Sequence, residues 1–188
     1  MAAGWRRWLV AALLATWPAG AWAQTPGEYE GQVTALAGAA SGGDVPRAGL
    51  TGGVAVAVFD PGGWGAELDI GHTRGFDPAY VDSGLTTLTI NAVRSGVFGR
   101  VRPFVGAGGG LLRVRACAGD CVRVVSRTDW ALDASGGASV LVSEHIGVRG
   151  EVRYVRFLGS HPGLPAASGA FDYWRTSLGV TLSWPFGW

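Results

Sequence analysis

The chain contains no lysine, and after residue 23 it has no leucine-rich stretch with helical periodicity. Of its 15 basic residues, all arginines, two precede residue 23, which leaves 13 against 14 acidic residues and a net charge near −1. Nucleic-acid binding needs a clustered basic surface, so we expect no nucleic-acid partner. There is also no Gly-x-Ser-x-Gly segment, no internal repeat and no second domain.

The N-terminus has the pattern of a secretory signal peptide. Arg6 and Arg7 precede an apolar run from Trp8 to Trp17, and Ala21-Trp22-Ala23 forms a small-x-small cleavage site. The run is too short to span a membrane as a helix, and the alternative readings are a buried helix or an uncleaved anchor. We therefore expect a signal peptide over 1–23 and one domain of 165 residues over 24–188.

The last stretch, residues 171–188, alternates apolar and polar side chains. One face carries aliphatic residues with aromatic residues at both ends, and a period of two indicates a β-strand. The face comprises Trp174, Thr176, Leu178, Val180, Leu182, Trp184, Phe186 and Trp188. The two terminal groups of aromatics are typical of the belts at the two interfaces of a membrane. Trp174 to Trp184 spans 11 residues, close to the ~9–11 that a tilted strand needs to cross a bilayer.

Seven further segments upstream have a strand pattern. They are residues 29–37, 50–59, 64–73, 85–93, 101–116, 129–142 and 146–158. The predicted connections are long after the first, third, fifth and seventh strands, including a loop over 39–47, and mostly shorter after the others. Outer-membrane barrels have this asymmetry between external loops and periplasmic turns. Glycines leave the facing of the fifth strand ambiguous, because a bulge there would shift its register by one residue.

Two features resemble a known family. The chain ends on an aromatic strand, and Pro103 to Leu111 resembles the Pro-aromatic-x-Gly-x-Gly strand of small outer-membrane barrels. The resemblance is to the OmpA/OmpX-type family, and it implies an all-β, eight-stranded antiparallel up-and-down transmembrane barrel in the bacterial outer membrane. In that family the terminal aromatic strand belongs to the signal read by the assembly machinery. The resemblance gives this role to Trp184, Phe186 and Trp188.

Charged side chains gather on the faces that should point into the barrel. They are Glu30, Glu67, Asp69, Asp129, Asp133, Arg149, Glu151, Arg153 and Arg175. Unpaired charges in an enclosed space are costly, so mixed signs predict a paired network. We expect Arg149 to pair with an acid on the neighbouring strand, such as Asp129 or Asp133. Because eight strands leave a lumen just wide enough for side chains, a polar plug is favoured over a conducting pore or ligand site.

Cys117 and Cys121 enclose three residues of one predicted loop. In an oxidising compartment two such cysteines are expected to form a disulfide. A redox motif would more often be Cys-x-x-Cys, and a metal site would need further ligands. The disulfide would pin the loop and add only about 2 kcal/mol to global stability, because so short a ring removes little chain entropy.

Catalytic candidates are few. His72, His145 and His161 have no metal-ligand spacing to another His or Cys. None is followed by the x-Ser of lipid A deacylase barrels, so we expect no enzyme, no metal and no cofactor. The interpretation is a non-enzymatic, monomeric protein that supports the envelope or interacts with the surroundings through its external loops. Its expected partners are outer-membrane lipid, the assembly machinery and an extracellular partner of the loops.

Three alternatives stay open. The first is an outer-membrane enzyme that modifies lipid, and the second is a narrow pore. The third is a secreted soluble barrel with a ligand inside, although a soluble barrel would place its apolar face inward and its polar face outward.

Overall fold

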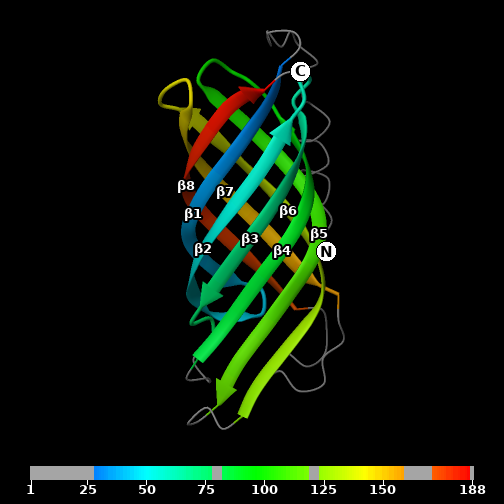
Figure 1. Cartoon of the computed structure of the whole chain (residues 1–188). Coiled ribbons are helices and arrows are strands. Elements are labelled where there is room, and N and C mark those ends of the chain that lie inside the picture. The colour runs from blue at the N-terminus through cyan, green and yellow to red at the C-terminus, as the bar shows by residue number, and fades with distance from the viewer. Residues whose placement is uncertain (1–27, 78–81, 119–122, 159–170, 187–188) are drawn as a thin grey trace, which may run out of the picture.

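The computed structural model describes residues 28–77, 82–118, 123–158 and 171–186, which form one closed antiparallel barrel of eight strands (Figure 1). Each strand pairs with its neighbours in sequence, and β1 pairs with β8 to close the ring. The strands are β1 (Tyr29–Gly42), β2 (Val45–Phe59), β3 (Trp64–Arg74), β4 (Asp82–Ser95), β5 (Val101–Ala118), β6 (Arg123–Leu141), β7 (Ile146–Phe157) and β8 (Asp172–Phe186). Within these ranges no helix has the length and apolarity to cross a membrane.

The period-two pattern decides which side chains face outward. Along β8 the burial alternates, so that Leu178 is 68% exposed while its neighbour Ser177 is 2% exposed. Asp69 on β3 is fully buried, whereas Ile70 is 48% exposed. Apolar residues therefore cover the outside and polar residues line the inside, which is the pattern of a barrel in lipid and the reverse of a soluble one. The predicted eight-stranded barrel is confirmed.

The two ends of the barrel differ. At one end, which we call the turn end, lie Tyr29, Phe186 and the connections 60–63, 96–100 and 142–145. The opposite end, which we call the loop end, carries the other four connections. The two longest connections, 75–81 and 158–171, lie at the loop end. In outer-membrane barrels the long connections face the exterior, so the loop end is the outer end.

The predicted loop over 39–47 is wrong, because β1 and β2 continue almost to each other. Gly42 and Gly43 have φ values of 74° and 61° and reverse the chain. The Asp44 amide donates to the Asp172 carbonyl (2.8 Å), and the Asp172 amide donates to Asp44 Oδ2 (3.0 Å). The small residues of this stretch resemble a loop in composition, but pairing with β8 holds them in the sheet.

The glycine-rich β5 has an unbroken register with both neighbours, so it contains no bulge. Phe104 and Leu112 face inward with Gly106, Gly108 and Gly110 between them. A Cβ atom on Gly108 or Gly110 would lie 2.0 Å from a backbone carbonyl oxygen of β4. Glycine is therefore required where β5 approaches β4 closely. The β5–β6 hairpin extends furthest at the loop end (Figure 1).

Two outward valines at different depths give a direct test of the lipid-facing surface. Val152 is 45% exposed near the middle of the strand, and Val142 is 65% exposed in a connection at the turn end. Val152→Arg should lower the free energy of unfolding by about 2–4 kcal/mol, and Val142→Arg by about 0–1 kcal/mol, because the cost of an arginine falls from the bilayer centre to its interface. Urea unfolding in lipid vesicles measures both. Equal costs at the two positions would contradict the assignment of this face to lipid.

Candidate functional site

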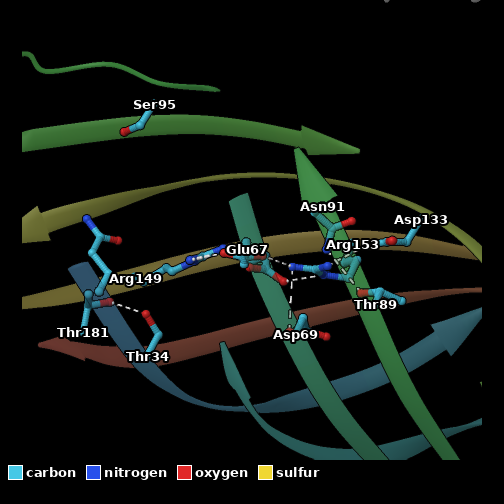
Figure 2. A network of polar contacts seen from close by, with 12 residues as sticks. Thr34, Glu67, Asp69, Thr89, Asn91, Ser95, Asp133, Arg149, Arg153 and Thr181 are labelled. Atoms are coloured by element: carbon cyan, nitrogen blue, oxygen red, sulfur yellow. Dashed lines mark hydrogen bonds and ion pairs between the residues drawn. The ribbon is translucent and has the colours of Figure 1, made fainter. Parts of the chain in front are cut away.

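Arg153 lies at the centre of the barrel interior and binds carboxylates from three strands. Its Nη2 atom lies 2.7 Å from Glu67 Oε1 on β3, and its Nη1 atom lies 2.5 Å from Asp133 Oδ2 on β6. Its Nε atom donates to Glu151 Oε1 at 2.9 Å on its own strand, β7. Figure 2 shows this guanidinium between Glu67, Asp69 and Asp133. Because β3 lies opposite β7 in the ring, Arg153 joins opposite walls of the barrel.

Two further arginines complete the arrangement. Arg149 lies 2.7 Å from Glu67 Oε2 and 2.6 Å from Glu151 Oε2, and its guanidinium lies 4.0 Å from the ring centre of Phe104. Arg175 on β8 lies 2.7 Å from Asp69 Oδ2 and 3.3 Å from Glu151 Oε1. We call these seven side chains the charge layer. Its members are Glu67, Asp69, Asp133, Arg149, Glu151, Arg153 and Arg175.

A glycine makes room for one of these arginines. A Cβ atom on Gly71 would lie 2.1 Å from Arg175 Nη1. Gly71 follows the inward Glu67 and Asp69 on the same face of β3. This face of the strand therefore carries two acidic side chains and then a position without a side chain. The period of two likewise turns Arg149, Glu151 and Arg153 to one side of β7.

The charge layer is almost completely shielded from solvent, with exposures of 0–5%. Burying a charge costs several kcal/mol unless an opposite charge and hydrogen bonds offset the loss of hydration. Glu67 and Asp69 each touch two arginines within 4 Å, and Glu151 touches all three. Among the described arginines only Arg153 forms an ion pair with Asp133. Asp133 therefore depends most on that arginine.

Apolar side chains fill the interior on both sides of the charge layer. The loop-end cluster includes Phe76, Phe171 and Tyr173, whose rings meet at centroid distances of 6.4 and 6.0 Å. The turn-end cluster consists of Ala57, Phe59, Val93 and Phe104. An eight-stranded barrel is just wide enough for its own side chains. The interior is thus a packed core with a charged middle.

A cavity of about 280 Å³ opens at the turn end. Glu30 and Arg102 form an ion pair in its wall, and the Gln32 amide donates to Glu30 Oε1 at 3.0 Å. No member of the charge layer lines this cavity, within the part of the chain that the structure describes. The cavity is therefore a mouth that ends before the charged middle.

Of the nine interior charges predicted from sequence, seven lie together in the charge layer. Glu30 lies instead at the turn-end mouth, and Asp129 pairs with Arg127 at 2.6 Å on the part of β6 near the loop end. The expected partner of Arg149 is corrected: Arg149 pairs with Glu67 across the lumen and with Glu151 on its own strand, and not with Asp129 or Asp133. Alternation identifies inward charges but does not identify their partners.

Arg102 was missed by the sequence reasoning. It lies on β5, two residues before the inward Phe104, and faces the mouth with Glu30. Because the facing of this glycine-rich strand is ambiguous in the sequence, Arg102 could not be assigned to the inner face. The unbroken alternation of Arg102, Phe104 and Leu112 would have been the signal.

Aromatic side chains mark both ends of the outer surface. At the turn end Trp184 is 43% exposed and lies across Gly31, and Phe186 stacks on Tyr29 with ring centres 5.8 Å apart. At the loop end the rings of Tyr154 and Trp174 lie 5.0 Å apart. The assembly role of Trp184 and Phe186 stays a prediction, and Trp188 lies outside the described residues.

The remaining candidates lie apart from the charge layer. His72 is exposed on the outer surface of β3, where its Nδ1 atom lies 2.9 Å from Thr86 Oγ1, and His145 is exposed in a turn-end connection. Among the residues with described positions, no three His, Cys, Asp or Glu side chains are arranged to hold a metal ion. Cys117 is buried near the loop end, but Cys121, His161 and the signal-peptide segment 1–23 lie outside the described residues. The predicted disulfide and the predicted cleavage stay predictions.

A closed barrel with an apolar outside, two aromatic belts and paired charges inside defines a transmembrane β-barrel protein of the bacterial outer membrane. The sequence profile of the outer membrane protein beta-barrel domain matches residues 9–186, so the chain belongs to that family. No curated protein sequence matches the chain at a significant level.

Solved structures of small outer-membrane barrels are similar in fold. Neisserial surface protein A has a TM-score of 0.62 at 18% identity, with 82% of this chain and 96% of that chain covered. A major outer membrane protein from Thermus thermophilus has a TM-score of 0.60 at 13% identity, with 83% and 99% covered. Ail, the attachment invasion locus protein of Yersinia pestis, has a TM-score of 0.56 at 13% identity, with 85% and 100% covered. At these identities the likeness establishes the fold.

The charge layer predicts a selective rescue. Arg153→Met should lower the free energy of unfolding by about 3–5 kcal/mol, because it leaves buried carboxylates without a partner. Asp133→Asn in the same chain should recover part of this loss, since Asp133 has no other arginine within reach among the described residues. Asp129→Asn is the matched control and should recover nothing, because Asp129 pairs with Arg127. Urea unfolding of the reconstituted variants measures all four chains, and equal rescue by both would contradict the assigned partners.

The terminal strand predicts a dependence on the last aromatic residue. Trp188→Asp should reduce the amount of protein assembled in the outer membrane far more than Trp188→Phe, because the predicted signal requires an aromatic side chain on the outward face of the last strand. Quantitative blotting of membrane fractions at equal expression is the measurement. Equal amounts of the two variants would show that Trp188 is not the signal.

Proposed function

We propose that this protein is a non-enzymatic component of the outer membrane that contributes to envelope integrity and interacts with its surroundings through the loop end. The observation that supports this function is the packed interior, where a paired charge layer lies between two apolar clusters. Such an interior favours a stable anchor over a channel, because eight strands enclose little space beyond their own side chains.

The β5–β6 hairpin is the part of the anchor best placed for contact with an extracellular partner. Its strands pair from Val101↔Val140 as far as Ala118↔Arg123, and it reaches beyond the other strands at the loop end (Figure 1). Arg113, Arg115 and Arg127 are exposed along it. Binding residues are commonly carried on loops that a rigid scaffold holds in place, and we place the interaction surface here.

The enzymatic alternative has one observation in its favour. His72 and the hydroxyl of Thr86 lie 2.9 Å apart on the outer wall, as a base and a nucleophile would. A nucleophile and its base also need a third group that orients the base. In the described part of the chain no carboxylate forms an ion pair with His72. The packed interior and this incomplete pair together favour the non-enzymatic function.

Reconstitution of the purified mature protein tests the proposal against both alternatives. In planar bilayers we expect no stepwise current, and in vesicles containing lipid A we expect no release of fatty acid. Persistent current steps would support a narrow pore. Fatty-acid release that His72→Ala abolishes would support an enzyme.

The interaction role is tested separately by shortening the hairpin. Replacing residues 117–124 with a two-residue turn keeps Arg113, Arg115 and Ser126 and should leave the barrel folded, which its shifted migration on an unboiled gel would show. The variant should restore detergent resistance to cells that lack the protein, but it should not restore adhesion of those cells to surfaces. Full adhesion with the shortened hairpin would contradict the proposed surface.

A further inference from the structure

A cavity of about 490 Å³ lies on the outer wall of the barrel near the loop end. We call it the basic hollow, and its wall carries three arginines and a histidine. The lining from β3, β4 and β5 is His72, Arg74, Gly84, Thr86, Arg113 and Arg115. Asp82 of β4 also lines the hollow, so with neutral histidine its formal charge is +2.

The hollow begins where the apolar surface ends. The outward residues Ile70, Leu88 and Leu111 are cross-strand neighbours, 39–48% exposed, on β3, β4 and β5. Two residues further along the same three strands are His72, Thr86 and Arg113, and two further still are Arg74, Gly84 and Arg115. Two residues advance a strand by roughly 6–7 Å, so the outer surface changes from apolar to basic over a distance similar to the depth of an interface.

The arginines of the hollow retain most of their hydrogen-bond donors. Arg113 donates from Nε to Ser126 Oγ at 3.1 Å, which leaves the four N–H groups of its terminal nitrogens available. Among the residues that the structure describes, Arg74 and Arg115 form no ion pair with a carboxylate. Guanidinium groups bind phosphate oxygens with two parallel hydrogen bonds, and they do so better than other cations.

Gly84 forms the floor of the hollow. Its cross-strand neighbours are Arg74 on one side and Arg115 on the other, each roughly 5 Å away between strands. A Cβ atom on Gly84 would lie 3.3 Å from His72 Cε1, so a side chain there would occupy the space between the two arginines. The missing side chain keeps that space open for an anion.

We propose that the basic hollow binds the phosphorylated headgroup of a lipid in the outer leaflet. The hollow lies on the lipid-facing surface at the loop end, which is the outer end, and its basic rim follows directly on the apolar band. A lipid whose chains pack on Ile70, Leu88 and Leu111 places its phosphate at the arginines. This site is separate from the packed interior, and it shares Arg113 and Arg115 with the base of the β5–β6 hairpin.

Native mass spectrometry of the full mature protein tests the site, with diphosphoryl lipid A as the probe. The variant Arg74→Gln/Arg113→Gln/Arg115→Gln should bind it about 100-fold more weakly, since each arginine at a lipid surface contributes roughly a factor of five. Arg156→Gln is the matched control, because Arg156 is an exposed arginine on β7 outside the hollow, and it should bind as the parent does. The shift between boiled and unboiled samples on a gel establishes that each variant is folded.

Gly84→Leu separates shape from charge, because it fills the floor and removes no arginine. It should weaken binding of lipid A by at least about tenfold if the phosphate lies between Arg74 and Arg115. Two further probes distinguish the source of the phosphate. Lipid A without its phosphates should bind to the parent no better than to the triple variant. Millimolar inorganic phosphate should not displace intact lipid A from the parent.

Three outcomes would overturn the proposal. The first is equal binding of lipid A by the parent and the triple variant, and the second is an equal loss in Arg156→Gln. The third is displacement of lipid A by inorganic phosphate, which would assign the hollow to a soluble anion.

Discussion

The pairing of β1 with β8 is the contact on which the rest of the molecule depends. It runs from Tyr29↔Phe186 to Ser41↔Trp174 and leaves the sheet without an open edge. In lipid no water is available for unpaired backbone groups, so a sheet can cross the membrane only when it is closed. Closure with eight strands also fixes the width of the lumen, and that width determines what the inward side chains can do.

The narrow lumen explains the charge layer. Arginine side chains from β7 and β8 are long enough to cross the lumen to β3, and Arg153 thereby ties β3, β6 and β7 together. Replacing a whole buried ionic network by apolar residues of similar volume is often neutral for stability, since the desolvation of buried ions opposes their attraction. Removing one partner alone is different, because it leaves an unpaired charge in a space that excludes water.

The outer surface follows a different rule from the interior. Over most of the height of the barrel this surface needs only to be apolar, so one apolar side chain can replace another at a lipid-facing position. At the loop end the surface is not uniform around the barrel: β7 and β8 carry the aromatic pair Tyr154 and Trp174, whereas β3, β4 and β5 carry the basic hollow. This asymmetry gives the lipid boundary a specific place for an anionic headgroup, in addition to the hairpin that faces the exterior.

The sequence by itself determined the local properties of this protein. A period of two is a property of each strand alone, so alternation was enough to predict eight strands, the facing of those with a clear pattern, and the aromatic belts of a membrane barrel. It gave a wrong loop at residues 39–47 and left the facing of β5 open, because small residues and glycines hide the pattern there. The tertiary structure alone decided which residues meet. Arg153 pairs with Glu67, 86 positions away, and Arg74 and Arg115 line one hollow, because strand order and register in the closed ring bring them together. Strand order and register are properties of the whole sheet, and the spacing of residues within one strand does not predict them.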